Sequence, residues 1–243
     1  ELKEHENALH ERRSQLLIEI IIKKSPYLSA RISNDHIKLI QNIIDPPKNA
    51  KGFIYQIVSN CSNSLDVDKF DYITRDMKMI GKNSSFDYKK LITQAVITNN
   101  SISYPKECAF DIWQLFSMRH TMHRQVYNHV GVVSAQLMMS DLMKKINKLL
   151  NISESIKDMS NFCKFTDSFV VQYPEFLDIC VINNIENNEQ KKIMGDIISL
   201  SQQIKTQRFY NLIFAFVLEK PINFSKEDIF KNEFAPYIDD III

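Results

Sequence analysis

Apolar residues recur every three or four positions along most of the chain, and this is the period of an amphipathic helix. Within residues 1–24 the spacing gives one broad apolar face, formed by Leu9, Leu16, Leu17, Ile20 and Ile21. A longer apolar pattern runs from Gly131 to Leu150, and another segment of helical character runs from Asn187 to Lys205. We expect a helix at each of these places, with the methionines at 138, 139 and 143 as ordinary core residues.

Two short segments have the character of strands instead. Asn99-Asn100 separates Val96-Ile97-Thr98 from Ser101-Ile102-Ser103-Tyr104, a pattern typical of a hairpin with a two-residue turn. The β-branched and aromatic run at residues 213–218 predicts a strand. We also expect short helices over 36–45 and 53–60 and a long helix that starts at Pro105. The sequence thus predicts a mainly α bundle over residues 1–206 and a small mixed α/β lobe over residues 207–243.

Polar residues gather on one face of a further helix, predicted from Val67 to Ile80 and ended by Gly81. At 3.6 residues per turn, Val67, Phe70 and Ile73 can face a core. The opposite face carries a carboxylate for a metal, cations, a phenol and a second carboxylate, from Asp68, Lys69, Tyr72, Arg75 and Asp76. Such a wall suits a ligand with phosphates at one end and hydroxyls at the other. The alternative is a solvated face of salt bridges.

A second polar stripe lies at helical spacing on the segment after Pro105. Arg119, His123 and Tyr127 are four residues apart, so they share one face. An arginine can bind phosphate oxygens with two nitrogens, a histidine can donate to them, and a tyrosine ring can close on a sugar. The alternative is a half-buried helix with polar residues at its edge.

Composition narrows the classes of function. The chain has 243 residues, 44% of them hydrophobic, which is enough for a full core. Its four glycines are scattered, so a phosphate-binding glycine loop is not expected. The net charge of +1 gives no support for nucleic acid as a partner. Four cysteines without a CxxC pair suggest reduced, mostly packed thiols of an intracellular protein, and no run of residues predicts a membrane span.

Several of these stretches also match a known family. Residues 66–76 read D-V-D-K-x-D-Y-x-x-R-D, and residues 119–129 read R-x-x-x-H-R-x-x-Y-x-H. Residues 10–14 read H-E-x-x-S, and residues 53–60 read F-x-Y-x-I-V-S-N. In these motifs the chain resembles the HD-superfamily dNTP triphosphohydrolases that contain SAM and HD domains, over most of residues 9–218. The resemblance implies an HD-domain-like helical bundle that hydrolyses a dNTP to deoxynucleoside and inorganic triphosphate.

The resemblance also implies a role for each candidate residue. His10 would act near the attacked phosphate as a proton donor, and Asp68 would bind the metal. Phosphate contacts would come from Lys69 and Arg119, and His123 belongs to the same motif as Arg119. The nucleotide would be lined by Tyr72 and Tyr127, with Asp76 accepting from its 3′-hydroxyl. Asn128 stands where the family has Gln, and this shorter amide is expected to loosen the contact with the base.

The resemblance implies a divalent metal, Fe, Mn or Mg, held by two His and two Asp. Only Asp68 of these four has a counterpart, and no His-Asp dipeptide occurs in the sequence. We therefore expect these 243 residues to be an incomplete or inactive hydrolase. One alternative is a catalytically dead nucleotide-binding or oligomeric scaffold module. Another is an HD phosphohydrolase with a different substrate, which Tyr127 disfavours because it points to deoxyribose.

The expected partners are dNTPs and further copies of the chain, because the missing upstream helices would leave apolar surface exposed. Activation by nucleotides between subunits, as in animal members of the family, is not expected. Lys90 and Arg208 keep the basic character at the matching positions, but several others are replaced by Pro105, Glu107, Gln125 and Val130.

Overall fold

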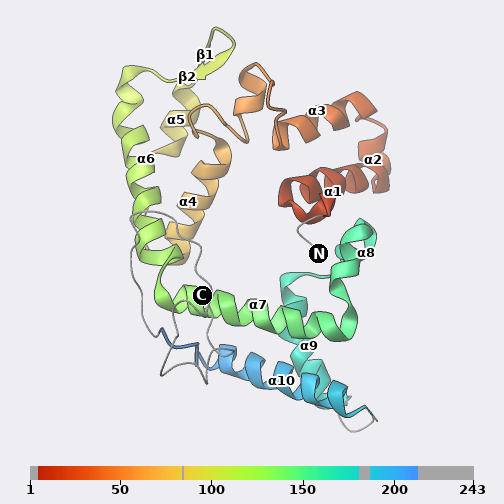
Figure 1. Cartoon of the computed structure of the whole chain (residues 1–243). Coiled ribbons are helices and arrows are strands. Elements are labelled where there is room, and N and C mark those ends of the chain that lie inside the picture. The colour runs from red at the N-terminus through yellow and green to blue at the C-terminus, as the bar shows by residue number, and fades with distance from the viewer. Residues whose placement is uncertain (1–4, 84, 181–186, 213–243) are drawn as a thin grey trace, which may run out of the picture. The chain divides into compact units, whose positions relative to one another are not determined.

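A computed structural model describes residues 5–83, 85–180 and 187–212 of the chain. Its contacts divide the chain into a unit of residues 1–210 and a unit of residues 211–243, and the first unit is described here. This part is mainly helical, as predicted, with one small sheet (Figure 1). Within the described residues, no helix combines the length and the apolar character needed to cross a membrane.

The helices follow one another with short connections. The first group comprises α1 (His10–Lys24), α2 (Pro26–Ser29), α3 (Asn34–Ile44), α4 (Val67–Met79) and α5 (Tyr88–Gln94). The second comprises α6 (Ala109–Met122), α7 (Val130–Leu150), α8 (Met159–Phe162), α9 (Asp167–Cys180) and α10 (Asn188–Lys205). Short 3-10 turns lie at η2 (Glu6–Ala8), η3 (Phe53–Gln56), η4 (Lys106–Cys108) and η6 (Ile152–Lys157), and η5 (His123–Tyr127) is a π-helical turn.

The predicted hairpin is confirmed with its turn. Strands β1 (Val96–Thr98) and β2 (Ser101–Ser103) pair antiparallel, with Thr98 opposite Ser101. Asn99 and Asn100 both have positive φ, 52° and 59°. This is the backbone of a type I′ turn, which asparagine tolerates better than most residues.

Two clusters of buried side chains hold the described helices together. The first core joins α4, α5 and α6, and its fully buried members include Ile73, Leu91 and Leu115. The second core joins α7, α9 and α10 around Met138, Ile146 and Ile197, so the methionine-rich segment of α7 is core as predicted. Figure 1 shows α4 beside α6 and α10 beside α7, in agreement with their contacts.

The structure corrects several details. Leu9 precedes α1 and is exposed, and Val67 is exposed on the first turn of α4. The segment 53–60 forms only the η3 turn, and the segment after Pro105 begins with the η4 turn before α6. Two of the three cysteines with described side chains, Cys61 and Cys163, are exposed rather than packed, whereas Cys108 is buried. The predicted strand at 213–218 lies outside the described residues, so the division at residues 206 and 207 stays a prediction.

Candidate nucleotide site

The first turn of α4 is built around the buried carboxylate of Asp66. Its Oδ1 accepts from the Lys69 backbone N–H at 3.0 Å, which caps the helix. Its Oδ2 accepts from the Asn60 N–H at 3.1 Å and pairs with the Lys69 ammonium at 2.8 Å. Only 1% of the Asp66 side chain and 18% of the Lys69 side chain are exposed. Lys69, which we expected to face a phosphate, is therefore held against Asp66 in this structure.

The last turns of α4 meet the π turn η5. The Tyr127 hydroxyl donates to Oδ2 of Asp76 at 2.6 Å. Burial, followed by this hydrogen bond and the charge of Asp76, raises the pKa of Tyr127, and the nearby Tyr72 adds to the effect. Tyr127 thus stays protonated as a donor. The structure brings Tyr72, Asp76 and Tyr127 together from two of the predicted polar stripes.

The π turn itself shapes the second stripe. The Asn128 N–H donates to the carbonyl of His123, five residues earlier, at 3.1 Å. The rings of His123 and Tyr127 meet edge to face, with centroids 5.0 Å apart. Single π turns inside helical segments occur frequently at functional sites. His123 and Tyr127 therefore remain neighbours, as the α-helical spacing predicted, although the turn between them is wider.

Arg119 lies one turn before His123, near the end of α6. Its Nε is buried and has no hydrogen-bond partner among the described residues. A buried N–H of a cation without a partner is costly, and the described residues supply no acceptor for this one. Arg119 is thus the member of the stripe best suited to bind phosphate.

Of the remaining candidates, His10 lies apart from this group, whereas Asn128 directly follows Tyr127. His10 begins α1, its side chain is 80% exposed, and its Nε2 contacts Glu11. α1 packs on α2, α3 and α8, and none of its extensive contacts in the described part of the chain is with α4 or α6. Asn128 is exposed at the end of the π turn. The structure therefore does not join His10 to the α4–η5 group.

The metal implied by the resemblance is not supported by the described residues alone. Asp68 is exposed on the first turn of α4. Nowhere in residues 5–83, 85–180 and 187–212 do three His, Cys, Asp or Glu side chains gather as a metal site. Fe, Mn and Mg sites need several donors, and Asp68 offers one.

Comparison with known proteins shows which proteins the chain is similar to. An HD domain-containing protein of Acanthamoeba polyphaga mimivirus is 44% identical over 170 residues, 70% of this chain and 37% of that protein. The Dictyostelium discoideum homologue of the deoxynucleoside triphosphate triphosphohydrolase SAMHD1 is 30% identical over 71% of this chain and 35% of its own length. Human SAMHD1 is 31% identical over 62% of the chain. No protein-family model matches the chain.

The chain is homologous to the SAMHD1-type dNTP triphosphohydrolases over about 70% of its own length. It spans about a third of the length of these relatives, 37% of the mimivirus protein and 35% of the Dictyostelium protein. The resemblance found in the motifs is thus confirmed.

Two features of the SAMHD1-like chain were missed by sequence reasoning. The first is the helix cap by Asp66, although an Asp three residues before Lys69 at a helix start is the pattern of a cap. The π turn at residues 123–127 has no sequence signal that we recognise.

Proposed function

We propose that this chain provides the deoxynucleotide-binding wall of a SAMHD1-like dNTP triphosphohydrolase. The observation that carries the proposal is the buried, unpaired Nε of Arg119, one turn from His123 and two turns from Tyr127. A phosphate oxygen would give this N–H the partner that the described residues do not.

The sugar end of the ligand would lie against Asp76 and Tyr127. Their hydrogen bond of 2.6 Å fixes the Tyr127 ring next to a carboxylate that still has lone pairs to accept a sugar hydroxyl. A ring fixed in this way can exclude a 2′-hydroxyl by contact, so deoxyribose is the expected sugar. Tyr72 would complete this side of the site.

A thermal-shift measurement with dGTP, and with GTP as the matched ligand, tests binding. Both titrations contain Mn²⁺. A ligand at about 100 times its dissociation constant adds roughly 2.7 kcal/mol to the free energy of unfolding, which moves the midpoint by several degrees. We expect dGTP to raise the midpoint and GTP to leave it nearly unchanged. Equal shifts would contradict the role given to Tyr127, and no shift with either would contradict the binding wall.

Matched variants locate the site. Asp76→Asn is expected to weaken dGTP binding by about tenfold, since an anionic acceptor is lost. Asp71→Asn is the control, because Asp71 is exposed on the same helix and pairs only with Arg75 among the described residues. If both variants weakened binding equally, the site would not lie at Asp76.

A second candidate function is a catalytically inactive nucleotide-binding or scaffold module. It is favoured by the missing cluster of metal donors within the described residues. Release of inorganic triphosphate from dGTP distinguishes the two: release by this chain would contradict the inactive module, whereas dGTP binding without release would support it. Lys69 would contact a phosphate only after leaving Asp66, Asp68 would serve as one ligand of a metal, and His10 would act only if α1 came near the group on α4 and η5.

A further inference from the structure

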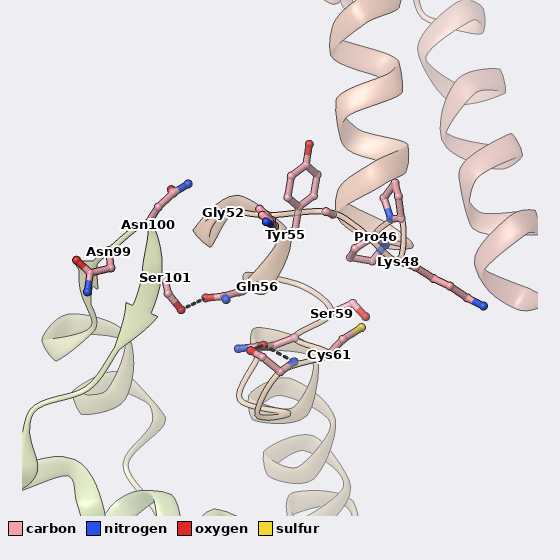
Figure 2. A pocket seen from close by; sticks show the side chains of 15 residues that line it. Pro46, Lys48, Gly52, Tyr55, Gln56, Ser59, Cys61, Asn99, Asn100 and Ser101 are labelled. Atoms are coloured by element: carbon pink, nitrogen blue, oxygen red, sulfur yellow. Dashed lines mark hydrogen bonds between the residues drawn. The ribbon is translucent and has the colours of Figure 1, made fainter.

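A pocket of about 750 Å³ opens on a different part of the first unit (Figure 2). Its walls are the loop after α3 (residues 46–52), the segment from Tyr55 to Ser62, and the hairpin turn at residues 99–101, and we call it the hairpin pocket. None of the candidate nucleotide-site residues on α4, α6 or η5 lines it. Its size lies within the roughly 300–1,000 Å³ typical of small-molecule sites.

The walls of the hairpin pocket are fixed without a ligand. The side-chain oxygen of Gln56 accepts from the Ser101 hydroxyl at 3.0 Å and from the Ile102 N–H at 2.7 Å, which ties η3 to the hairpin. Gly52 has a φ of +122°, and a Cβ there would lie 3.1 Å from Nδ2 of Asn100. Gly52 therefore permits both the backbone turn and the close approach of the two walls.

The wall formed by residues 55–62 is held in place by the buried side chain of Asn60. Asn60 is buried, accepts from the Ser62 N–H and hydroxyl, and donates to the Leu65 carbonyl. Its backbone N–H binds Asp66, as described above. The pocket is thus preformed, and a ligand would not have to order these groups.

These bonds leave several donors of the lining residues free, and among them the Lys48 side chain points away from the hairpin in Figure 2. Lys48, Lys51, Tyr55, Ser59 and Asn100 line it, and their side chains have no hydrogen bond or ion pair within the described part of the chain. Gln56 uses its oxygen in the wall and keeps its NH₂ group available.

Among the described residues, no acidic side chain lines the pocket to balance the charges of Lys48 and Lys51. None of its fifteen described lining residues is Asp or Glu. Asp66, which accepts from the N–H of the lining residue Asn60, is paired with Lys69. Two ammonium groups and several neutral donors without a carboxylate favour a dianion that is rich in oxygen acceptors.

Other lining residues are apolar and suit a hydrocarbon part of a ligand. Pro46, Pro47, Ala50 and the Tyr55 ring give one side of the pocket an apolar surface. Small-molecule sites combine such surface with a few polar groups that fix the orientation of the ligand.

We propose that the hairpin pocket binds a small phosphate monoester that carries a ring. Lys48 and Lys51 bind the phosphate, whose charge near −2 at neutral pH matches their two charges. The ring packs on the proline and Tyr55 side. This site is separate from the candidate nucleotide site and does not depend on it.

Phenyl phosphate is a suitable probe for the whole chain, followed by ¹H–¹⁵N spectra. We expect saturable shifts of amides in residues 48–62 and 99–102, with no comparable shifts from phenol. Benzoate, which has the ring and a single negative charge, is expected to bind at least about tenfold more weakly, because it loses charge-assisted bonds.

Two double variants that each remove two positive charges test whether Lys48 and Lys51 bind the phosphate. Lys48→Gln with Lys51→Gln is expected to weaken phenyl phosphate binding by at least about tenfold. Lys191→Gln with Lys192→Gln, on the exposed start of α10, is expected to leave it unchanged. Asn100→Asp, which keeps a residue that tolerates the turn, is expected to weaken binding through charge repulsion.

Four results would overturn the proposal: no saturable binding of phenyl phosphate, shifts centred on residues 69–76 and 119–127, equal affinity for benzoate, or an equal effect of both lysine pairs. The spectra of each variant also show whether the fold is kept, so a loss of binding is separable from unfolding.

Discussion

The Tyr127 hydroxyl and the Asp76 carboxylate are 51 positions apart in the chain and 2.6 Å apart in space. This bond joins the end of α4 to the π turn and orders the middle of the candidate site. Removing the hydroxyl with Tyr127→Phe should lower the free energy of unfolding by about 1–2 kcal/mol, since the acceptor is charged and the pair is partly buried. Urea unfolding measures this loss.

The control for Tyr127→Phe is Tyr27→Phe. Tyr27 is 64% exposed, and its hydroxyl has no hydrogen bond within the described residues. We expect a change of less than about 0.5 kcal/mol. A double-mutant cycle with Asp76→Asn should return most of the Tyr127 effect as coupling energy, and additive effects of the two variants would argue against the bond.

Asp66 gives a second prediction, because it both caps α4 and neutralises Lys69. Asp66→Ala should destabilise the protein by about 2–4 kcal/mol, through loss of the cap and of a nearly buried ion pair. Asp66→Ser keeps a capping oxygen and loses only the charge, so it should cost less. Thermal and urea unfolding of both variants measure the difference, and equal losses would mean that the cap contributes nothing.

Which face of α4 is buried can be tested by comparing a buried residue with an exposed one. Ile73 is fully buried in the first core, and Ile73→Ala should cost about 2–5 kcal/mol. Val67, on the same helix but 40% exposed, is the control, and Val67→Ala should cost less than about 1 kcal/mol. The reverse order of the two effects would mean that α4 presents a different face to α6.

The ion pair between Lys90 and Asp111 predicts a dependence on pH. The two groups lie 2.5 Å apart between α5 and α6. The hydrogen bond with Lys90 lowers the pKa of Asp111, and the same bond raises the pKa of Lys90. The pair therefore stabilises the fold between the ordinary pKa of Asp, about 3.9, and that of Lys, about 10.4.

The directions of the two pKa shifts determine how the stabilisation changes at low and at high pH. The contribution of Asp111 is lost as the pH falls through its lowered pKa, and that of Lys90 is lost as the pH rises through its raised pKa. Midpoints of thermal unfolding for the natural chain and for Asp111→Asn should differ by a constant amount between these limits and converge in acid. Glu154→Gln is the control, because its pair with Lys157 is more than half exposed on both sides and should matter little.

The sequence predicted those elements whose signals are local. The Asn-Asn turn fixed the hairpin because asparagine accepts positive φ, and Gly81, with a φ of +74°, ends α4 as expected. The two polar stripes were also recognised, because the period of a helix places their members on one face.

The sequence-based prediction for residues 53–60 was wrong, and the position of the Lys69 side chain was not predicted, because contacts with other parts of the fold decide these conformations. The segment 53–60 has the apolar spacing of a helix, but past η3 its backbone bonds to the start of α4 instead: Ile57 accepts from Val67, and Asn60 donates to Asp66. Leu9 fits the apolar pattern of α1 but precedes its first turn. The pairing of Lys69 with Asp66 depends on burial of the carboxylate, which the spacing of charges does not reveal.

The π turn has a consequence for how this chain can vary in length. It directly follows α6 and is wider than an α-helical turn, because the Asn128 N–H bonds to a carbonyl five residues earlier instead of four. Adding or deleting one residue in the α-helical part between Arg119 and His123 would carry Tyr127 roughly 100° around the helix axis, away from Asp76. In homologous sequences the spacing between Arg119 and Tyr127 should therefore tolerate substitution but not insertion or deletion, unlike the loops on either side.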